Sequence, residues 1–473
     1  MTDTAPTQHI SQRLESLGQG HLVHHADTLD AEARSRFFEQ LAGLDLEELG
    51  TLIEQNGRSY TPESIPADLS PAKVIGLDDP SREPARHTGE ALIRAGKVAC
   101  FTVAGGQGSR LGYDGPKGCF PTSCVNNKPL FQIFAEGILG TQRRHSVTVP
   151  WYIMTSPLNH DATVSFFAAN DHFGLEPSAV RFFPQGVMPS IDKQSGALLL
   201  AEPGMLATNP DGHGGSFKAL RVSGALDDMR QRGVEHLSYF QVDNPSTRPV
   251  DPVFLGLHAS SPDSSGQFSS KMVAKASWDE KVGVFCLGNG RTCVIEYSDL
   301  PEDLAKQTNS AGGLAFNAGS VAIHAIGVDF VDKVTSDDAF ALPFHRAIKK
   351  VPNLDPETGA RREPDEPNAI KLERFVFDGI PIADRSIVVE TDRLEEFAPV
   401  KNATGNDSIV SSKRLQTERA ARWLEANSVS VPRRTDGSVD AVIEISPLTA
   451  QDQGELSAHD LPEAIEPGAT VVL

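Results

Sequence analysis

Basic residues, cysteines and long apolar runs are all scarce in this chain of 473 residues. Its 43 lysines and arginines face 63 aspartates and glutamates, and the resulting formal charge of −20 argues against a nucleic acid or an anionic membrane as the main partner. No apolar run approaches the roughly 20 residues of a membrane span, and the N-terminus lacks a basic region followed by an apolar one. The sequence therefore predicts a soluble protein that is not exported.

Cysteine usage points to a reducing compartment. The five cysteines are odd in number, and none forms a C-x-x-C pair, so neither a disulfide framework nor a zinc site is indicated. We expect a cytoplasmic protein.

The length predicts two or three domains. Residues 7–56 have apolar residues at helical spacing, and a proline-rich connection over 60–86 leads to a short helix that ends near Gly96. We therefore expect a helical N-terminal extension over 1–96 and a core over 97–390. An amphipathic helix over 412–427, followed by short strands and turns, predicts a small C-terminal β-containing domain over 391–473.

Strand-like and helical patterns alternate in the expected core. Such an order favours an α/β fold with a largely parallel sheet, whose ligands gather at the carboxyl ends of the strands. Later strand-like runs predict antiparallel strands, two of them joined by a hairpin through Gly288-Asn289-Gly290, so the sheet should be mixed. The expected parallel strands are 98–104, 151–155, 180–184 and 237–242, and the expected antiparallel strands are 271–276, 283–287 and 291–297.

The first core strand ends in a glycine-rich loop, AGGQGSRLG over 104–112, followed by YDGPK. Its glycines let backbone N–H groups approach phosphates or a flat base, and Arg110 and Lys117 add positive charge. The spacing fits no dinucleotide fingerprint, because Leu111 occupies the third glycine position, and no P-loop, because Lys117 precedes Gly118. An ordinary turn between a strand and a helix is the alternative reading.

Seven motifs follow one another along the chain. They are the glycine loop through PK, FFPQG (182–186), PDGHGG (210–215), VDN (242–244), FNAG (316–319), IKLERFVFD (370–378) and EFAPVKN (396–402). In this order they resemble the motifs of the eukaryotic-type UDP-N-acetylhexosamine pyrophosphorylases, within the wider UDP-glucose and UDP-sugar pyrophosphorylase family. The match covers most of residues 97–402, and the resemblance implies a Rossmann-like nucleotidyltransferase core.

The resemblance implies a uridine site and a metal site. Gln185 would offer an amide, which both donates and accepts, to the imide edge of uracil. Asp243 would be the carboxylate that binds Mg²⁺, an ion that keeps one or two protein carboxylates and takes its other ligands from phosphate and water. A polar turn residue and a helix cap or turn are the respective alternatives. The remaining nucleotide-binding residues implied are Ala104, Gly105, Gly106 and Gly212.

The resemblance also implies a sugar site and four phosphate-binding cations. Lys371 and Lys401 would contact phosphates, while Arg110 and Lys117 would hold the leaving pyrophosphate; the alternative is that each is a surface charge. Glu296 could instead be a solvated hairpin residue. The implied sugar-binding residues are Gly283, Glu296, Tyr297 and Asn317, together with His213.

The implied activity joins UTP to a sugar 1-phosphate and releases pyrophosphate, with N-acetylglucosamine 1-phosphate as the expected sugar substrate. His213 departs from the hexosamine enzymes, which carry Asn at this place, and matches the glucose and broad-specificity branches. Imidazole is larger than an amide and can gain charge near the phosphates. A UDP-glucose or broad-specificity UDP-sugar pyrophosphorylase is therefore the alternative. A catalytically silent nucleotide-sugar-binding regulator is an alternative of another class.

Overall fold

β3 (Val98–Val103) runs inside a sheet, because its first four residues are at most 1% exposed and leave no face for solvent. It pairs in parallel with β4 (Trp151–Thr155) on one side and with β11 (His236–Gln241) on the other. β5 (Val180–Pro184) continues the sheet in parallel beyond β4. All four expected parallel strands are thus confirmed, within one residue at either end.

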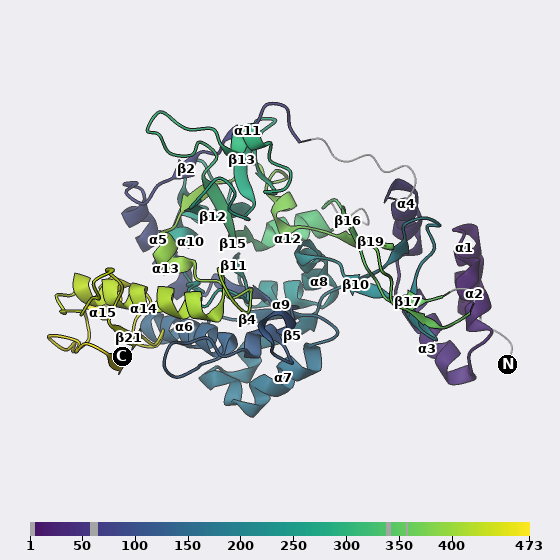
Figure 1. Cartoon of the computed structure of the whole chain (residues 1–473), viewed down its shortest axis with the longest axis horizontal. Helices are drawn as coiled ribbons and strands as arrows, with labels where there is room; N and C mark the ends of the chain where they lie inside the picture. The colour runs from purple at the N-terminus through teal and green to yellow at the C-terminus, as the bar shows by residue number, and fades with distance from the viewer. Residues whose placement is uncertain (1–4, 57–64, 337–341, 356–357) are drawn as a thin grey trace. The chain divides into compact units, whose positions relative to one another are not determined.

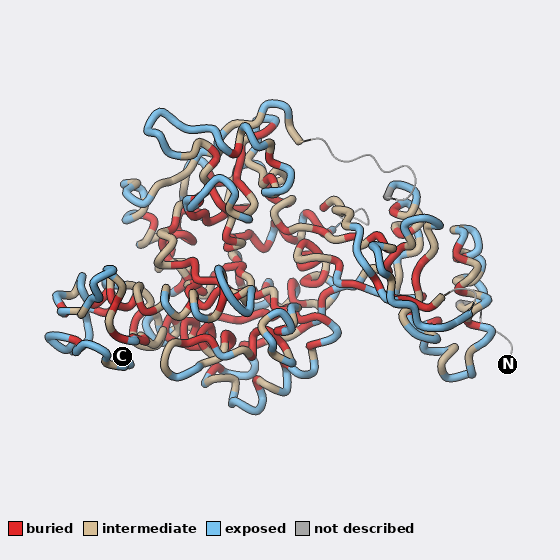
Figure 2. Tube along the Cα trace, in the orientation of Figure 1, coloured by how far each residue is buried: buried red, intermediate tan, exposed pale blue. Residues whose placement is uncertain are grey.

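The sheet is mixed, as expected, and has eleven strands among the described residues. Its main path is β2-β20-β12-β15-β11-β3-β4-β5, in which β2 is Val74–Ile75 and β20 is Val388–Glu390. Along this path, pairing is antiparallel only where β15 (Ala318–Gly327) meets its neighbours. β12 (Phe268–Ala274) begins three residues before the expected strand. The hairpin of β13 (Val284–Gly288) and β14 (Arg291–Ile295) joins β15 at one edge. Figure 2 shows buried segments concentrated in these strands.

The structure is a computed structural model that describes residues 5–56, 65–336, 342–355 and 358–473, and these form two compact units (Figure 1). Unit 2 holds the large sheet and comprises residues 65–185, 216–341 and 376–473. Unit 1 combines residues 1–64 with two later segments, 186–215 and 342–375. Residues 60–64, the first part of the expected proline-rich connection, lie outside the described residues.

Unit 1 is built from helices that pack on short strands. Phe37, Phe38 and Leu41 of α3 (Ala31–Ala42) are buried in one cluster with Ile191, Leu198 and Ile370 from the later segments. Gln19 also donates to the carbonyl of Gly196 at 3.0 Å and accepts from the N–H of Leu198 at 2.8 Å. The other helices are α1 (Ala5–Ser16), α2 (Gly20–Ala26) and α4 (Leu46–Asn56), and the strands include β10 (Thr208–Pro210), β16 (His345–Lys349) and β19 (Ala369–Glu373).

This grouping differs from the three segments expected from the sequence. The N-terminal helices share a core with distant segments, whereas α5 (Arg82–Arg94) packs in unit 2 against α10 (Pro252–Ser260). Glycines permit that contact: a Cβ on Gly89 would lie 1.8 Å from the carbonyl oxygen of Pro252.

The C-terminal residues also group with unit 2, although they have a small core of their own around Trp423, Leu424 and Ile443. α14 (Ile409–Ala426) begins three residues before the expected helix because Ser408 caps it. No helix in the described ranges combines the length and the apolar character that a membrane crossing requires.

Candidate active site

The glycine loop after β3 is held by a buried asparagine. Asn159 is 1% exposed, and its side-chain amide donates to the carbonyls of Ala104 at 3.1 Å and Gly106 at 3.3 Å. Its oxygen accepts from the N–H of Ser156 at 2.8 Å, which ties the end of β4 to the same loop. Asn159 is not among the residues predicted from the sequence, because its only signal is its position just before α7 (His160–Ala169), where an ordinary helix cap is expected.

Gln185 lies against this loop, at the end of β5. Its backbone N–H donates to the carbonyl of Thr155 at 2.8 Å, and its side chain approaches Gly105 so closely that a Cβ there would lie 2.6 Å from Oε1. Only glycine leaves room for the amide in this position. The structure therefore brings together four of the five predicted nucleotide-binding residues, Ala104, Gly105, Gly106 and Gln185.

A charged cluster lies beside the loop. The N–H of Lys117 donates to the Gly106 carbonyl at 3.0 Å, and its Nζ lies 3.7 Å from Oδ2 of Asp243, which follows β11. Burial lowers the pKa of Lys117, Asp243 opposes that shift, and Arg110 and Lys401 add to it, so these three charged groups all lie within electrostatic reach of Lys117. Asp407 also interacts electrostatically with Lys401 and Asp243. Three cations against these two carboxylates still leave a surplus of positive charge, which suits an anionic ligand.

Lys401 reaches the cluster through a backbone contact between distant segments. The N–H of Val400 donates to the carbonyl of Asp243 at 2.8 Å, which sets Lys401 one residue from that contact. The structure thus gathers Arg110, Lys117, Asp243 and Lys401, which the sequence placed in three separate motifs.

The predicted sugar-binding residues lie around the β13–β14 hairpin. A Cβ on Gly283 would lie 3.4 Å from Oε1 of Glu296, and the carbonyl of Gly283 accepts from the N–H of Ser320 in β15 at 2.8 Å. Asn317 lies just before β15, where its carbonyl accepts from the N–H of Lys275 at 2.9 Å. Gly283 and Glu296 are thus neighbours, whereas Tyr297 is 47% exposed at the end of the hairpin.

Gly212, His213 and Lys371 belong to unit 1. Gly212 has a φ of +85°, and a Cβ there would lie 2.3 Å from the carbonyl oxygen of Arg374. Both the backbone conformation and the lack of space therefore require glycine at this position. Backbone bonds from Arg374 N–H to Asp211 and from Gly214 N–H to Arg374, both 2.8 Å, align this segment with the end of β19. Half-buried Lys371 lies within β19, opposite Ala347.

The imidazole of His213 forms part of an aromatic stack. Its ring stacks on Phe375 with centroids 5.3 Å apart, and Phe375 stacks on His345 at 4.3 Å. Burial, reinforced by His345, lowers the pKa of His213 to about 4. The sequence suggested that this imidazole can gain charge near phosphates; its surroundings instead favour the neutral ring at pH 7, so shape and hydrogen bonding are what it offers a ligand.

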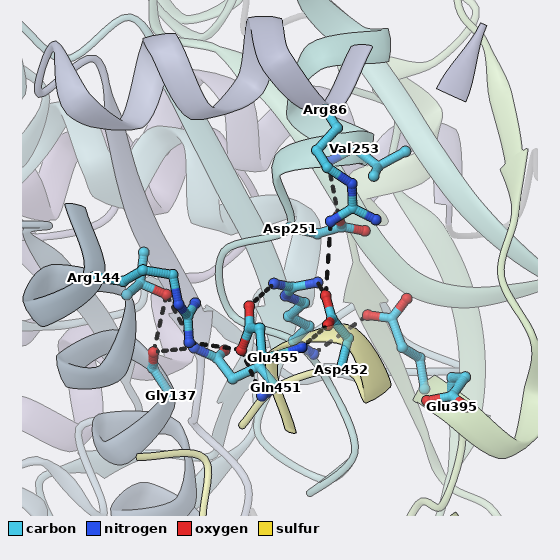
Figure 3. A network of polar contacts seen from close by, with 12 residues as sticks. Arg86, Gly137, Arg144, Asp251, Val253, Glu395, Gln451, Asp452 and Glu455 are labelled. Atoms are coloured by element: carbon cyan, nitrogen blue, oxygen red, sulfur yellow. Dashed lines mark hydrogen bonds and ion pairs between the residues drawn. The ribbon is translucent and has the colours of Figure 1, made fainter. Parts of the chain in front are cut away.

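A separate cavity of about 800 Å³ lies in unit 2, between α5, α10 and the C-terminal residues. Among the described residues, none of the predicted site residues lines this cavity. The charged side chains that line it are largely paired with one another. Figure 3 shows this network, in which Arg248 bridges Asp452 at 2.9 Å and Glu455 at 2.7 Å, while Arg86 and Arg144 pair with the same two carboxylates. Since this cavity offers little unpaired charge, we place the candidate active site at the glycine loop.

The comparisons with known proteins agree on one family. Residues 67–433 match the profile of the UTP–glucose-1-phosphate uridylyltransferase family. The chain is 32% identical over 467 residues to a probable UDP-N-acetylglucosamine pyrophosphorylase from Dictyostelium discoideum, covering 95% of this chain and 94% of the relative. It is 34% identical to UDP-N-acetylglucosamine diphosphorylase 2 from Arabidopsis thaliana, covering 96% and 92%.

A solved structure is similar over almost the whole chain. It is the uridine diphosphate N-acetylglucosamine pyrophosphorylase from Trypanosoma brucei in complex with inhibitor. The TM-score is 0.81 at 26% identity, covering 98% of each chain. The similarity therefore extends through both units and the C-terminal residues.

Proposed function

This chain belongs to the UTP–glucose-1-phosphate uridylyltransferase family, and on that premise we propose that it joins UTP to N-acetylglucosamine 1-phosphate, releasing pyrophosphate. The near full-length similarity to proteins named for UDP-N-acetylglucosamine supports this sugar. The observation that carries the proposed activity is the cluster of Arg110, Lys117 and Lys401 around Asp243, because it combines surplus positive charge with a carboxylate beside the glycine loop.

The nucleotide would bind across the glycine loop. The exposed backbone at Gly106 allows a flat base or a phosphate to approach without a side chain in the way. The amide of Gln185, packed on Gly105, can donate to and accept from the imide edge of uracil. In this proposal Asn159 fixes the loop in the shape that the base requires.

The chemistry is an in-line transfer of a uridylyl group. A phosphate oxygen of the sugar 1-phosphate attacks the α-phosphorus of UTP, a new P–O bond forms, and the bond to pyrophosphate breaks on the opposite side. The attacking phosphate is already anionic at neutral pH, so no general base is required. Rate enhancement then depends on aligning two anions and on neutralising the charge of the transition state. We assign this neutralisation to Arg110, Lys117, Lys371 and Lys401.

Magnesium fits the donors that this site offers. Asp243 supplies one carboxylate, and no group of three potential metal ligands occurs in the described parts of the chain. A single protein carboxylate, completed by phosphate oxygens and water, is a normal donor set for Mg²⁺ but a poor one for zinc. Bound there, the ion would offset negative charge on the phosphates.

Glucose 1-phosphate is the second candidate substrate, and His213 is the observation that favours it. Because its imidazole is neutral and stacked on Phe375, it can discriminate by shape rather than by charge. Contacts that accept or exclude one substituent are worth only about 1–3 kcal/mol, so one residue can reverse a preference. We propose an enzyme that accepts both sugars, with only a modest preference for the acetylated one.

A silent nucleotide-sugar-binding regulator would not require this constellation. Binding alone needs no carboxylate for a metal and no cations for a leaving pyrophosphate. That Lys117, Asp243 and Lys401 are held together by contacts across the sheet therefore supports catalysis.

The proposed activity is tested by measuring pyrophosphate release from UTP and Mg²⁺ with a panel of 1-phosphates, those of N-acetylglucosamine, N-acetylgalactosamine, glucose and galactose. We expect release with N-acetylglucosamine 1-phosphate and, at lower kcat/KM, with glucose 1-phosphate. A strong preference for glucose 1-phosphate would establish the second candidate. Nucleotide-sugar binding without any release would establish the regulator.

A further inference from the structure

Asn244 clamps the segment that carries Lys401. Its Nδ2 donates to the carbonyl of Glu396 at 2.6 Å, across 152 positions of sequence, and its Oδ1 accepts from the N–H of Ala398 at 3.0 Å. The side chain is 5% exposed, and the same Oδ1 also accepts from the N–H of Ser246 at 3.3 Å. The amide is therefore occupied by the protein itself, which argues for holding the chain rather than contacting a substrate.

The side chain of Glu396 fixes the same segment through a second set of contacts. Its carboxylate is 7% exposed and accepts hydrogen bonds from Nζ of Lys271, from the hydroxyl of Thr391 at 2.6 Å and from the N–H of Arg248 at 3.3 Å. Lys271 is itself 2% exposed and pairs with Asp251 at 2.6 Å. A buried carboxylate with this many donors is costly to move, because any shift leaves charged groups unpaired.

The far side of Lys401 is also fixed. The N–H groups of Lys401 and Asn402 donate to the carbonyl of Asp407 at 2.6 and 3.0 Å. Asp407 adopts a left-handed φ of +55°, and the next residue, Ser408, caps α14. Lys401 thus lies between a clamped segment and the start of a long helix, which leaves its backbone little freedom.

These contacts have a common geometric result. The backbone bond from Val400 to Asp243, the Asn244 clamp and the Glu396 anchor hold residues 396–400 against residues 243–246. The backbone positions of Asp243 and Lys401, which are distant in the sequence, are therefore kept at a set separation. Rate enhancements in aligned reactions are sensitive to such distances, since a misplacement of about 1 Å can cost about 10²-fold.

We propose that Asn244 and Glu396 are positioning residues that set the separation between Asp243 and Lys401, so that the metal-side carboxylate and the phosphate-binding ammonium act as one unit. This role rests on the proposed uridylyl transfer. It predicts that the two residues influence turnover through Lys401 and leave the uridine contacts of the glycine loop unaffected.

A double-mutant cycle tests this role. Asn244→Ala should lower kcat by about 10- to 10²-fold while changing the KM for UTP by less than about threefold. In a Lys401→Ala background the same substitution should cost less than about threefold, because the group it positions is gone. Glu396→Gln should show the same non-additivity, and it replaces Asn244→Ala should that variant not fold.

Asp251→Asn is the matched control. It removes the other carboxylate partner of Lys271, from a residue that makes no hydrogen bond to residues 396–401. The variant should lower the melting temperature about as much as Glu396→Gln, with kcat within about threefold of wild type. Full additivity with Lys401→Ala, or an equal kcat loss in Asp251→Asn, would overturn the positioning role. If Lys401→Ala alone has no effect, the proposed phosphate contact fails first, which separates the two failures.

Discussion

The charged cluster around Asp243 and the aromatic stack around His213 both form just beyond strands, yet they present opposite chemistry. In the cluster, Lys117, Arg110 and Lys401 lie around Asp243, Asp407 also interacts with Lys401, and contacts between distant segments hold the cluster together. In the stack, a neutral imidazole packs face to face on Phe375. On the proposed function, charge neutralisation and sugar selection would therefore be served by separate parts of the chain. Substitutions in the first should lower the rate, and substitutions in the second should change the preference.

The largest effect is expected at the centre of the cluster. Asp243→Asn keeps the shape of the side chain but removes the charge that would hold Mg²⁺, so we predict a fall in kcat of about 10³-fold or more with a melting temperature near wild type. Activity should be measured across a magnesium titration. A rate close to that of the wild type at every magnesium concentration would remove Asp243 from the metal site.

Substitutions of Lys401, in the charged cluster, and of Lys371, in unit 1, compare how much each lysine contributes to the rate. We predict that Lys401→Ala and Lys371→Ala each lower kcat/KM by about 10²-fold, about 2.7 kcal/mol of transition-state stabilisation. Lys349, which is exposed at the end of β16, provides a matched control as Lys349→Ala, expected at the wild-type rate. A full effect at Lys401 with none at Lys371 would confine the charge neutralisation to unit 2.

Substitutions of Gly105 and Gly106 distinguish a clash within the protein from a clash with the bound nucleotide. A Cβ on Gly105 would displace the Gln185 amide, whereas a Cβ on Gly106 would meet nothing closer than Cδ of Lys117 at 4.0 Å. Gly105→Ala should raise the KM for UTP about tenfold, the cost of roughly one hydrogen bond to uracil. Gly106→Ala should raise it only if the nucleotide itself approaches the loop. An unchanged KM in both variants would rule out the glycine loop as the uridine site.

The smallest expected effect is at the stack. His213→Asn should shift the ratio of kcat/KM for N-acetylglucosamine 1-phosphate over glucose 1-phosphate by about three- to tenfold towards the acetylated sugar. Because the pKa of His213 is lowered to about 4, the ring stays neutral from pH 6 to 8 and protonates only as the pH falls towards 4. The ratio in the wild type should therefore be constant over pH 6–8. A change centred near pH 6.5 would contradict the neutral ring.

Local sequence signals were enough to predict the strands and the glycine loop. A buried strand such as β3 is a continuous apolar run, and the glycines that follow mark the turn directly. The motifs that contain Gln185, Asp243 and Lys401 were identified by resemblance to a family. Gln185 and Asp243 each follow a parallel strand, so their position at the same edge of the sheet could be expected from the strand order, whereas that of Lys401 could not.

Contacts between distant residues could not be predicted from the sequence. Asn159 and Asn244 look like ordinary caps or turn residues until their partners are known, and Glu396 was noticed only as the first residue of a motif. The composition of unit 1 was missed for the same reason: three segments separated by long stretches share one core, and periodicity within each segment says nothing about the others.

The most direct test of the central claim is a ³¹P NMR time course of wild-type protein with UTP, N-acetylglucosamine 1-phosphate and Mg²⁺, run beside the Asp243→Asn variant. Uridylyl transfer predicts that UDP-N-acetylglucosamine, followed by the signals of its two diphosphate phosphorus atoms, and pyrophosphate form in equal amounts in the wild type, and far more slowly in the variant. UMP with pyrophosphate would instead indicate hydrolysis. Unchanged substrate signals in the wild type would contradict the proposed activity outright.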